Sequence, residues 1–193
     1  MNQADNILSK LRTQTGTLHA ELEKTPLSKA LLDDNVSVEN YVAYLQKMRG
    51  VLDFYENRVF PVLAETLPDL PERQKLSLID ADLGNLLPDT AEPLPFENPK
   101  ALNSQVPYAL GCLYVMEGST LGGKVILKHV SKKLGIEPDK GGSFFDGYGN
   151  ETGRFWKLFL STLQTYSLQN DADPAIIAGA ADTFMSIKNH FEY

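Results

Sequence analysis

The chain has 193 residues, enough for one domain with a sizeable core, and we expect a single domain over residues 1–193. Its 18 basic and 25 acidic residues leave a net charge of −7, which argues against nucleic acid as a general partner. The single Cys112 excludes an internal disulfide and suits a reducing cytosol. The longest apolar run, Tyr108 to Met116, is half of the roughly 18–20 residues that a membrane span needs, and the N-terminus has no signal pattern, so we expect a cytoplasmic protein with no membrane contact.

Helical periodicity runs through the chain, and strand patterns are nearly absent. In the first half, apolar spacing predicts a helix that ends near Thr25–Pro26, a short turn over Lys29–Leu32, a long helix from an N-cap at Ser37 to about Pro61, and a helix from Pro71 to Gly84. The following stretch, Pro88 to Pro99, contains four prolines and is predicted to be a stiff loop.

The second half is predicted to begin with one long apolar helix from about Val106 to Leu134, which Gly135 ends. A loop rich in glycine and aromatic residues covers Gly141–Gly149, and two more helices are expected over about Glu151–Leu168 and from Pro174 to the C-terminus. This pattern predicts an all-α fold, a bundle of about seven helices.

Glycines are concentrated inside the long apolar helix, where each costs about 1 kcal/mol of stability relative to alanine. They are Gly111, Gly118, Gly122 and Gly123. Gly118 and Gly122 share one face because they are four residues apart, and Gly123 lies beside them. A helix face without Cβ atoms lets a flat or bulky ligand touch the backbone, or it serves close packing between helices. The glycines alone leave both interpretations open.

Three histidines are the candidate metal ligands. His190 lies in the last turn of the last helix, where a cation suits the helix dipole, and His129 lies among lysines, so both are expected at the surface. His19 lies at the edge of the apolar face of the first helix, one turn before Glu23, which can bind one ring nitrogen and leave the other for a metal. A purely structural His19 fits the same position. No Glu-x-x-His pair occurs, which disfavours a ferritin-like di-iron site.

Two segments together resemble the haem oxygenase family. Arg12–Glu23, RTQTGTLHAELE, is similar to the proximal segment of that family, and Tyr114–Lys124, YVMEGSTLGGK, is similar to its distal helix. The distal form resembles bacterial members, including those associated with bacteriophytochromes. The resemblance extends over essentially the whole chain in helix order and length, and it implies a haem-oxygenase-like helical bundle.

The resemblance also implies roles for individual residues. His19 matches the proximal ligand of the haem iron, Glu23 the carboxylate that orients it, and Arg12 a basic residue that pairs with a haem propionate. Gly118, Gly122 and Gly123 match the distal backbone that lies over the porphyrin. Tyr114 is a further haem-binding position that the resemblance implies. The late-helix basic residues that bind propionates in animal members have no clean match in this chain, and Arg154 and Lys157 are the nearby substitutes. Ser119 is a departure, since animal members have an aspartate there that orders the waters protonating bound oxygen.

The implied activity is oxygen-dependent opening of haem b to biliverdin, with release of CO and ferrous iron. Haem is then substrate and cofactor together, and the electrons come from an external ferredoxin or flavoprotein reductase. A phytochrome that accepts the bilin is a further implied partner. Lys124, Lys128 and Lys132 recur every four residues beyond Gly123, and we interpret this basic stripe as a docking site for an acidic electron donor.

Two alternatives share the fold. The first is a non-catalytic haem-binding or carrier protein, which Ser119 keeps open. The second is a thiaminase-like enzyme, which needs a cysteine nucleophile with a basic partner. Cys112 is the one cysteine of the chain, and no basic residue in its vicinity marks it as activated.

Overall fold

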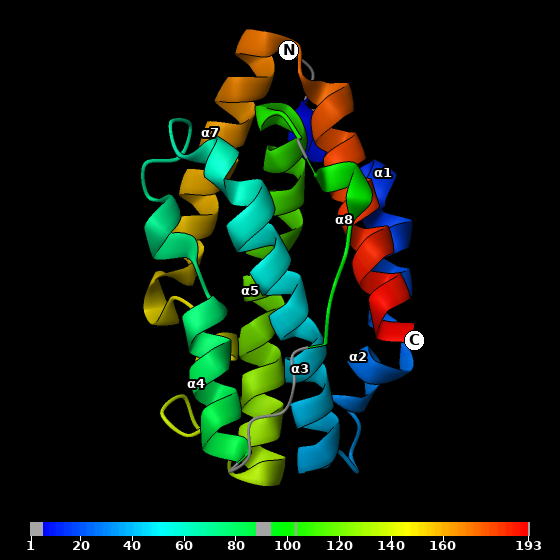
Figure 1. Cartoon of the computed structure of the whole chain (residues 1–193), viewed down its shortest axis with the longest axis vertical. Helices are drawn as coiled ribbons and strands as arrows, with labels where there is room; N and C mark the ends of the chain where they lie inside the picture. The colour runs from blue at the N-terminus through cyan, green and yellow to red at the C-terminus, as the bar shows by residue number, and fades with distance from the viewer. Residues whose placement is uncertain (1–5, 88–93, 103, 193) are drawn as a thin grey trace.

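The apolar faces of the helices meet around one long helix, α5 (Val106–Leu134), in the computed structural model, which describes residues 6–87, 94–102 and 104–192. Helices α8 (Asp173–Glu192) and α1 (Ile7–Glu23) lie side by side on the right of α5 in Figure 1, and α4 (Leu76–Leu86) lies on the left. The buried residues form one cluster to which all the long helices contribute.

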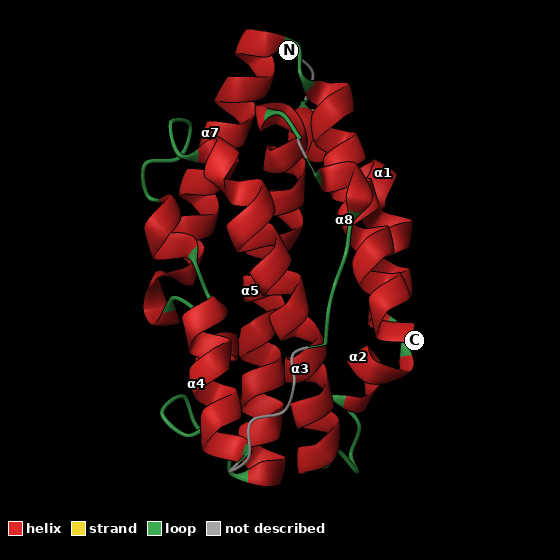
Figure 2. Cartoon of the chain, viewed as in Figure 1, coloured by secondary structure: helices red, strands yellow, loops and turns green. Residues whose placement is uncertain are grey.

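The remaining α-helices are α2 (Pro26–Ala30), α3 (Val38–Phe54), α6 (Ser143–Asp146) and α7 (Thr152–Asn170). A π-helical turn, η2 (Tyr55–Val59), continues α3, and the 3₁₀ segments are η3 (Phe60–Leu63), η4 (Leu70–Arg73), η5 (Pro99–Ala101) and η6 (Gly149–Glu151). Seven α-helices have five residues or more, and the described residues contain no strand (Figure 2), which confirms the predicted all-α bundle.

Two residues predicted to begin or end helices do so in the structure. Ser37 caps α3 and forms a reciprocal capping box with Asn40. Gly135 ends α5 with a φ of 71°, a left-handed conformation that glycine adopts without a Cβ clash. The predicted bounds of α5 are therefore confirmed at both ends.

Two of the glycines serve the crossing of α5 and α8. A Cβ atom at Gly111 would overlap the backbone carbonyl of Ile176, and one at Gly179 would overlap that of Tyr108. The two backbones approach so closely that neither position accepts a side chain. Gly111 is therefore a packing residue and is separate from any ligand site.

Three predicted elements differ from the structure. The short turn expected over Lys29–Leu32 begins earlier, at Pro26. The helix expected from Pro71 to Gly84 is split, because the chain is extended at Gln74 and the Lys75 and Leu76 amides bind the Glu56 carboxylate instead of helical carbonyls. The loop expected over Gly141–Gly149 contains the helical turn α6. Half of the predicted Pro88–Pro99 loop, residues 88–93, lies outside the described residues.

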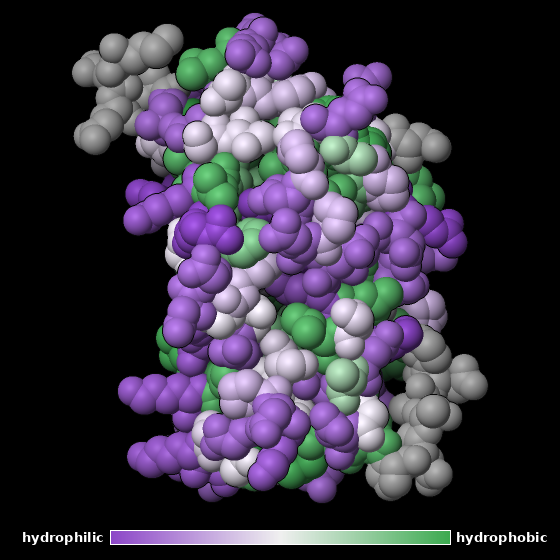
Figure 3. All heavy atoms as spheres, turned by 90° about the vertical axis from the view of Figure 1, so that its left-hand side faces the viewer, coloured by the Kyte–Doolittle hydropathy of each residue, from purple (hydrophilic) through white to green (hydrophobic). Residues whose placement is uncertain are grey.

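None of the described helices is long and apolar enough to cross a membrane. The face shown in Figure 3 is mainly hydrophilic, with hydrophobic residues scattered among charged and polar ones. This face therefore offers no broad apolar surface for a partner.

Candidate functional site

His19 lies on the outer face of α1 with its imidazole accessible. Its side chain is 56% exposed, and its Nε2 atom lies 3.6 Å from Oε1 of Glu23. The ring stands edge-on against Phe184 of α8, with the two centroids 5.4 Å apart. A carboxylate this close can accept an imidazole N–H and leave the other nitrogen for a metal.

The surroundings of His19 restrict the kind of metal that it could bind. The described residues contain no group of three or more His, Cys, Asp or Glu side chains that could hold a metal ion. A metal at His19 must therefore bring most of its own ligands. Iron in a porphyrin does this, since the macrocycle supplies four nitrogens and the protein adds an axial ligand.

The glycines of α5 expose an apolar face in the middle of the helix. A Cβ atom at Gly122 would meet nothing within 4 Å, and one at Gly118 would meet only the Trp156 ring, at 3.6 Å. Leu121 and Val125, on the same side, are 45% and 61% exposed. An apolar helix face interrupted by glycine is flat and unprotected, so it fits a flat apolar ligand.

Gly123 differs from its two neighbours. It is buried, and a Cβ atom there would lie 2.8 Å from the carbonyl oxygen of Phe145. The structure therefore places Gly123 in the packing of α5 against α6, whereas Gly122 lies on the exposed face and the half-buried Gly118 borders that face beside Trp156.

The other predicted haem-contacting residues lie on three helices: Arg12 on α1, Tyr114 on α5, and Arg154 and Lys157 on α7. Burial raises the pKa of Tyr114 on α5, and the positive charge of Arg12 on α1 opposes that rise. Tyr114 lies against Trp156 of α7, with ring centroids 5.6 Å apart. Next to Trp156, Lys157 is exposed, whereas Arg154 is held by an ion pair with Glu151.

Ser119 lies between the exposed face and a small internal cavity. Its hydroxyl donates a hydrogen bond of 2.7 Å to the Met116 carbonyl, and its oxygen keeps the capacity to accept one. The cavity has a volume of about 10 Å³ and is lined by Ser119, Glu117 and Glu56 among others. This volume is close to that needed for one water molecule.

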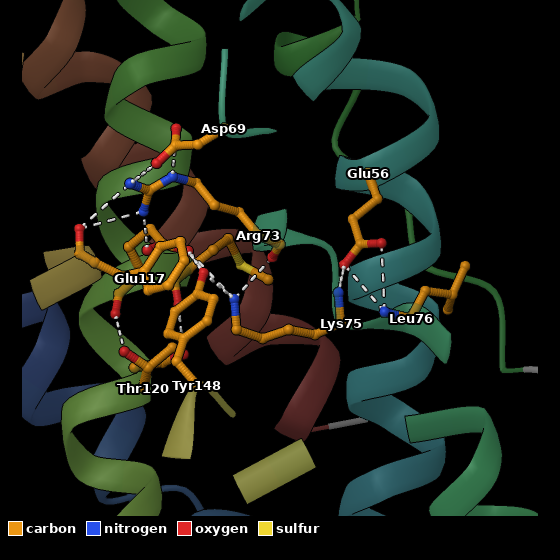
Figure 4. A network of polar contacts seen from close by, with 11 residues as sticks. Glu56, Asp69, Arg73, Lys75, Leu76, Glu117, Thr120 and Tyr148 are labelled. Carbon is orange, nitrogen blue, oxygen red and sulfur yellow. Dashed lines mark hydrogen bonds and ion pairs between the residues drawn. The ribbon is translucent and has the colours of Figure 1, made fainter. Parts of the chain in front are cut away.

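A buried ionic cluster surrounds Glu117, the residue before Gly118 (Figure 4). Glu117 is 1% exposed, and its two carboxylate oxygens lie 2.5 Å from Arg73 Nη1 and 3.2 Å from Lys75 Nζ. The Tyr148 hydroxyl donates to the same carboxylate over 2.5 Å. Asp69 completes the cluster with an oxygen 2.7 Å from Arg73 Nη2. Burial raises the pKa of Tyr148 and lowers that of Lys75.

The sequence interpretation missed this cluster. Its one available signal was Glu117 itself, a charged residue directly after the apolar run Leu113–Met116 of the long helix. A buried carboxylate requires a partner, so such a residue predicts cations elsewhere in the chain. Nothing local in the sequence identifies Arg73 and Lys75 as those cations.

The other two histidines are bound to backbone groups. The Nε2 atom of His129 lies 2.9 Å from the Asp33 carbonyl oxygen. His190, which we expected at the surface, is half-buried, with Nε2 3.2 Å from the Lys47 carbonyl oxygen and its ring against Phe96. Burial lowers the pKa of His190. His19 is thus the histidine whose ring is seated against a neighbour but not bound to a backbone carbonyl.

The sequence pattern of the family described as Heme oxygenase matches residues 5–193, almost the entire chain. The chain belongs to the haem oxygenase family. It is also 28% identical over 182 residues to heme oxygenase PigA of Pseudomonas aeruginosa, a match that covers 91% of this chain and 86% of that protein.

Solved structures of haem oxygenases share the fold. The NO- and CO-bound haem oxygenase from Neisseria meningitidis superposes with a TM-score of 0.74 at 23% identity, over 97% of this chain and 90% of that one. The haem oxygenase from Leptospira interrogans superposes with a TM-score of 0.81 at 16% identity, over 97% and 98% of the two chains. At these identities the likeness concerns the architecture of the bundle.

The thiaminase-like alternative finds no support in the geometry. Cys112 is buried, and its thiol faces the Gly179 carbonyl oxygen at 3.8 Å. Burial raises the pKa of the Cys112 thiol to about 12, so the thiol stays protonated at neutral pH. A protonated, inaccessible thiol cannot act as a nucleophile.

Proposed function

We propose that this protein binds haem b between α1 and α5 and, with O₂ and electrons from outside, opens the ring to biliverdin with release of CO and ferrous iron. One observation carries the proposal: an accessible histidine with a carboxylate one turn away on α1, and an exposed apolar face without side chains at Gly118 and Gly122 on α5. Membership of the haem oxygenase family supports both the substrate and the reaction.

The residues of α1 bind and orient the substrate. His19 would supply a nitrogen to the haem iron, and the Glu23 carboxylate, 3.6 Å from Nε2, is close enough to orient the imidazole and increase its basicity. Arg12 pairs with a propionate at the open edge. Lys157 and Arg154 on α7 are the candidate second propionate partners, and both are exposed.

The residues of α5 supply space and control access of protons. The macrocycle carries the redox chemistry, so this side of the site contributes room rather than a reactive side chain. Gly118 and Gly122 leave the volume in which O₂ reaches the ring edge. The Ser119 oxygen, beside the water-sized cavity, accepts a hydrogen bond from a water and thereby serves the proton delivery that an aspartate serves in animal members.

The electron donor is proposed to be an acidic ferredoxin or flavoprotein reductase that docks on Lys124, Lys128 and Lys132. Lys128 and Lys132 are exposed and Lys124 is half-buried, so all three can reach a partner. A bilin-accepting phytochrome is the proposed recipient of the product, and the cytoplasm is the proposed location.

Reconstitution with haemin tests the function. The protein should form a 1:1 complex with a Soret band, and ascorbate under air should then bleach that band while biliverdin absorbance grows. A Soret complex that persists under reductant and air would instead identify a haem carrier. Absence of any stoichiometric complex would contradict the proposal.

A further inference from the structure

The glycine- and aromatic-rich segment 141–149 contacts α5 on both sides of the exposed glycine face. On one side, Tyr148 donates its phenol hydrogen to Glu117, the residue before Gly118. On the other side, the Phe145 carbonyl oxygen lies 2.8 Å from where a Cβ of Gly123, the residue after Gly122, would be. The five residues from Gly118 to Gly122 therefore lie between two points of attachment to the same segment.

The segment itself is firmly held by the rest of the bundle. The buried Asp82 carboxylate accepts the backbone N–H groups of Ser143 and Phe144, at 2.9 and 2.8 Å, and the Ser143 hydroxyl. The Tyr41 hydroxyl donates to the Gly141 carbonyl over 2.8 Å. These bonds tie the segment to α4 and α3, so it provides a fixed support for α5.

Tyr148 is held in one orientation. Its ring stacks on Phe155, with centroids 4.2 Å apart and planes 9° from parallel. The neighbouring Gly147 and Gly149 have φ values of 57° and 55°, so the backbone turns on both sides of the tyrosine. Lys75 donates to the Tyr148 oxygen over 2.7 Å, and that oxygen in turn donates to Glu117 (Figure 4). The phenol is thus the link between the segment and the buried carboxylate.

We propose that Tyr148 is a positioning residue: through Glu117 it holds the Gly118–Gly122 stretch of α5 at a fixed distance from α1, and so sets how closely the distal backbone lies over the substrate. The role of this distance in the reaction rests on the function proposed above. The support of α5 by Tyr148 is proposed for the haem-free protein and rests only on the contacts described above. Glu117 is buried, and its hydrogen bond to Tyr148 joins it to the segment, so removal of the phenol loosens the attachment.

Amide hydrogen exchange of the haem-free protein tests this support of α5. Tyr148→Phe removes one oxygen and keeps the ring stack, and it should increase the exchange rates of the amides of residues 118–122 about 5-fold. Tyr41→Phe is the matched control, because the Tyr41 phenol also binds this segment but donates its hydrogen bond to Gly141 rather than to a residue of α5. It should leave exchange at residues 118–122 within about 2-fold of wild type.

A second variant keeps the test independent of the polar cluster. Gly149→Ala introduces a Cβ at a φ of 55°, which strains the turn that presents Tyr148 while leaving every side chain of the cluster in place. It should increase exchange of the same amides by a smaller factor than Tyr148→Phe.

The substrate-bound protein tests the functional part. Tyr148→Phe should lower haemin affinity about 3- to 10-fold and broaden the distribution of biliverdin isomers, a readout that a general loss of stability does not change. Exchange rates in Tyr148→Phe equal to those of wild type or of Tyr41→Phe would overturn the proposal, as would an unchanged isomer distribution. If exchange responds as expected but wild type forms no haemin complex, the support of α5 stands and the proposed function fails.

Discussion

At the scale of single residues, the three distal glycines have different roles. Gly122 faces open space, Gly118 faces the Trp156 ring, and Gly123 touches the backbone of α6. The sequence placed all three in one motif, and only the neighbouring elements distinguish a position that leaves room for a ligand from one that lets two backbones meet.

This difference predicts opposite outcomes for two substitutions. Gly122→Leu should leave the free energy of unfolding unchanged or raise it by up to about 1 kcal/mol, because leucine favours the helix, while haemin affinity falls at least about tenfold. Gly123→Ala should cost about 1–3 kcal/mol, because its Cβ meets the Phe145 carbonyl at 2.8 Å. Urea unfolding and haemin titration measure the two effects. Normal haemin affinity in Gly122→Leu would show that this face binds no ligand.

The buried thiol of Cys112 predicts a pH dependence. Its pKa is raised from 9.0 to about 12 by burial, so above pH 9 the unfolded chain loses a proton that the native state retains. The contribution to stability is fully present below pH 9 and is lost as pH rises from 9 to 12, by up to about 4 kcal/mol. Cys112→Ala should therefore lose less stability than wild type over this range, as measured by urea unfolding. Rapid labelling of the native thiol at pH 8 would contradict the burial.

At the scale of elements, the π-helical turn η2 explains why the helix expected at Pro71 is split. The turn places the Glu56 carboxylate at the start of α4, where it accepts the amides of Lys75 and Leu76 at 2.7 and 3.1 Å. The first amides of a helix have no partner within the helix, so Glu56 acts as an N-cap from another part of the chain.

Removal of this distant cap should destabilise the protein. Glu56→Ala leaves two amides at the start of α4 without a partner and is expected to cost about 1–3 kcal/mol in urea unfolding. Glu56→Gln keeps an acceptor oxygen and should cost less. Asn57→Ala is the matched control in the same turn, since the Asn57 amide bonds only at the exposed surface, to Asp53. Equal losses for Glu56→Ala and Asn57→Ala would refute the capping role.

The basic stripe on α5 makes a prediction about the electron donor. Replacement of Lys128 by Glu should slow donor-driven turnover, and the defect should shrink at high salt because ions screen the attraction between the proteins. Ascorbate-driven turnover should remain normal, because a small reductant needs no docking surface. Equal slowing with both reductants would mean that the lysine acts on haem binding or on folding.

At the scale of the whole molecule, local signals predicted most of the architecture. Ser37 correctly predicted the start of α3, and Gly135 and the apolar period of the long helix correctly predicted the bounds of α5. These features could be predicted because each depends on residues within one turn. The cluster of Glu117 with Arg73 and Lys75 was missed because Glu117 is more than forty positions away from both cations in the chain. Contacts of that kind depend on the packing of the bundle.

The candidate site could be proposed from the sequence for the same reason. Its two halves are each contained in one helix, His19 with Glu23 on α1 and Gly118 with Gly122 on α5. What the sequence could not predict was the support behind them, namely the carbonyl of Phe145 against Gly123 and the phenol of Tyr148 on Glu117. Both supports come from a segment that had been expected to be an irregular loop.

Titration with haemin, followed at the Soret band for wild type and His19→Ala, tests the central claim most directly. Wild type should give a 1:1 complex with a histidine-ligated ferric spectrum. His19→Ala should lose that spectrum and most turnover and recover the ligated spectrum with added imidazole, while His129→Ala and His190→Ala should keep the wild-type spectrum. An unchanged Soret band and undiminished turnover in His19→Ala would contradict the placement of haem between α1 and α5.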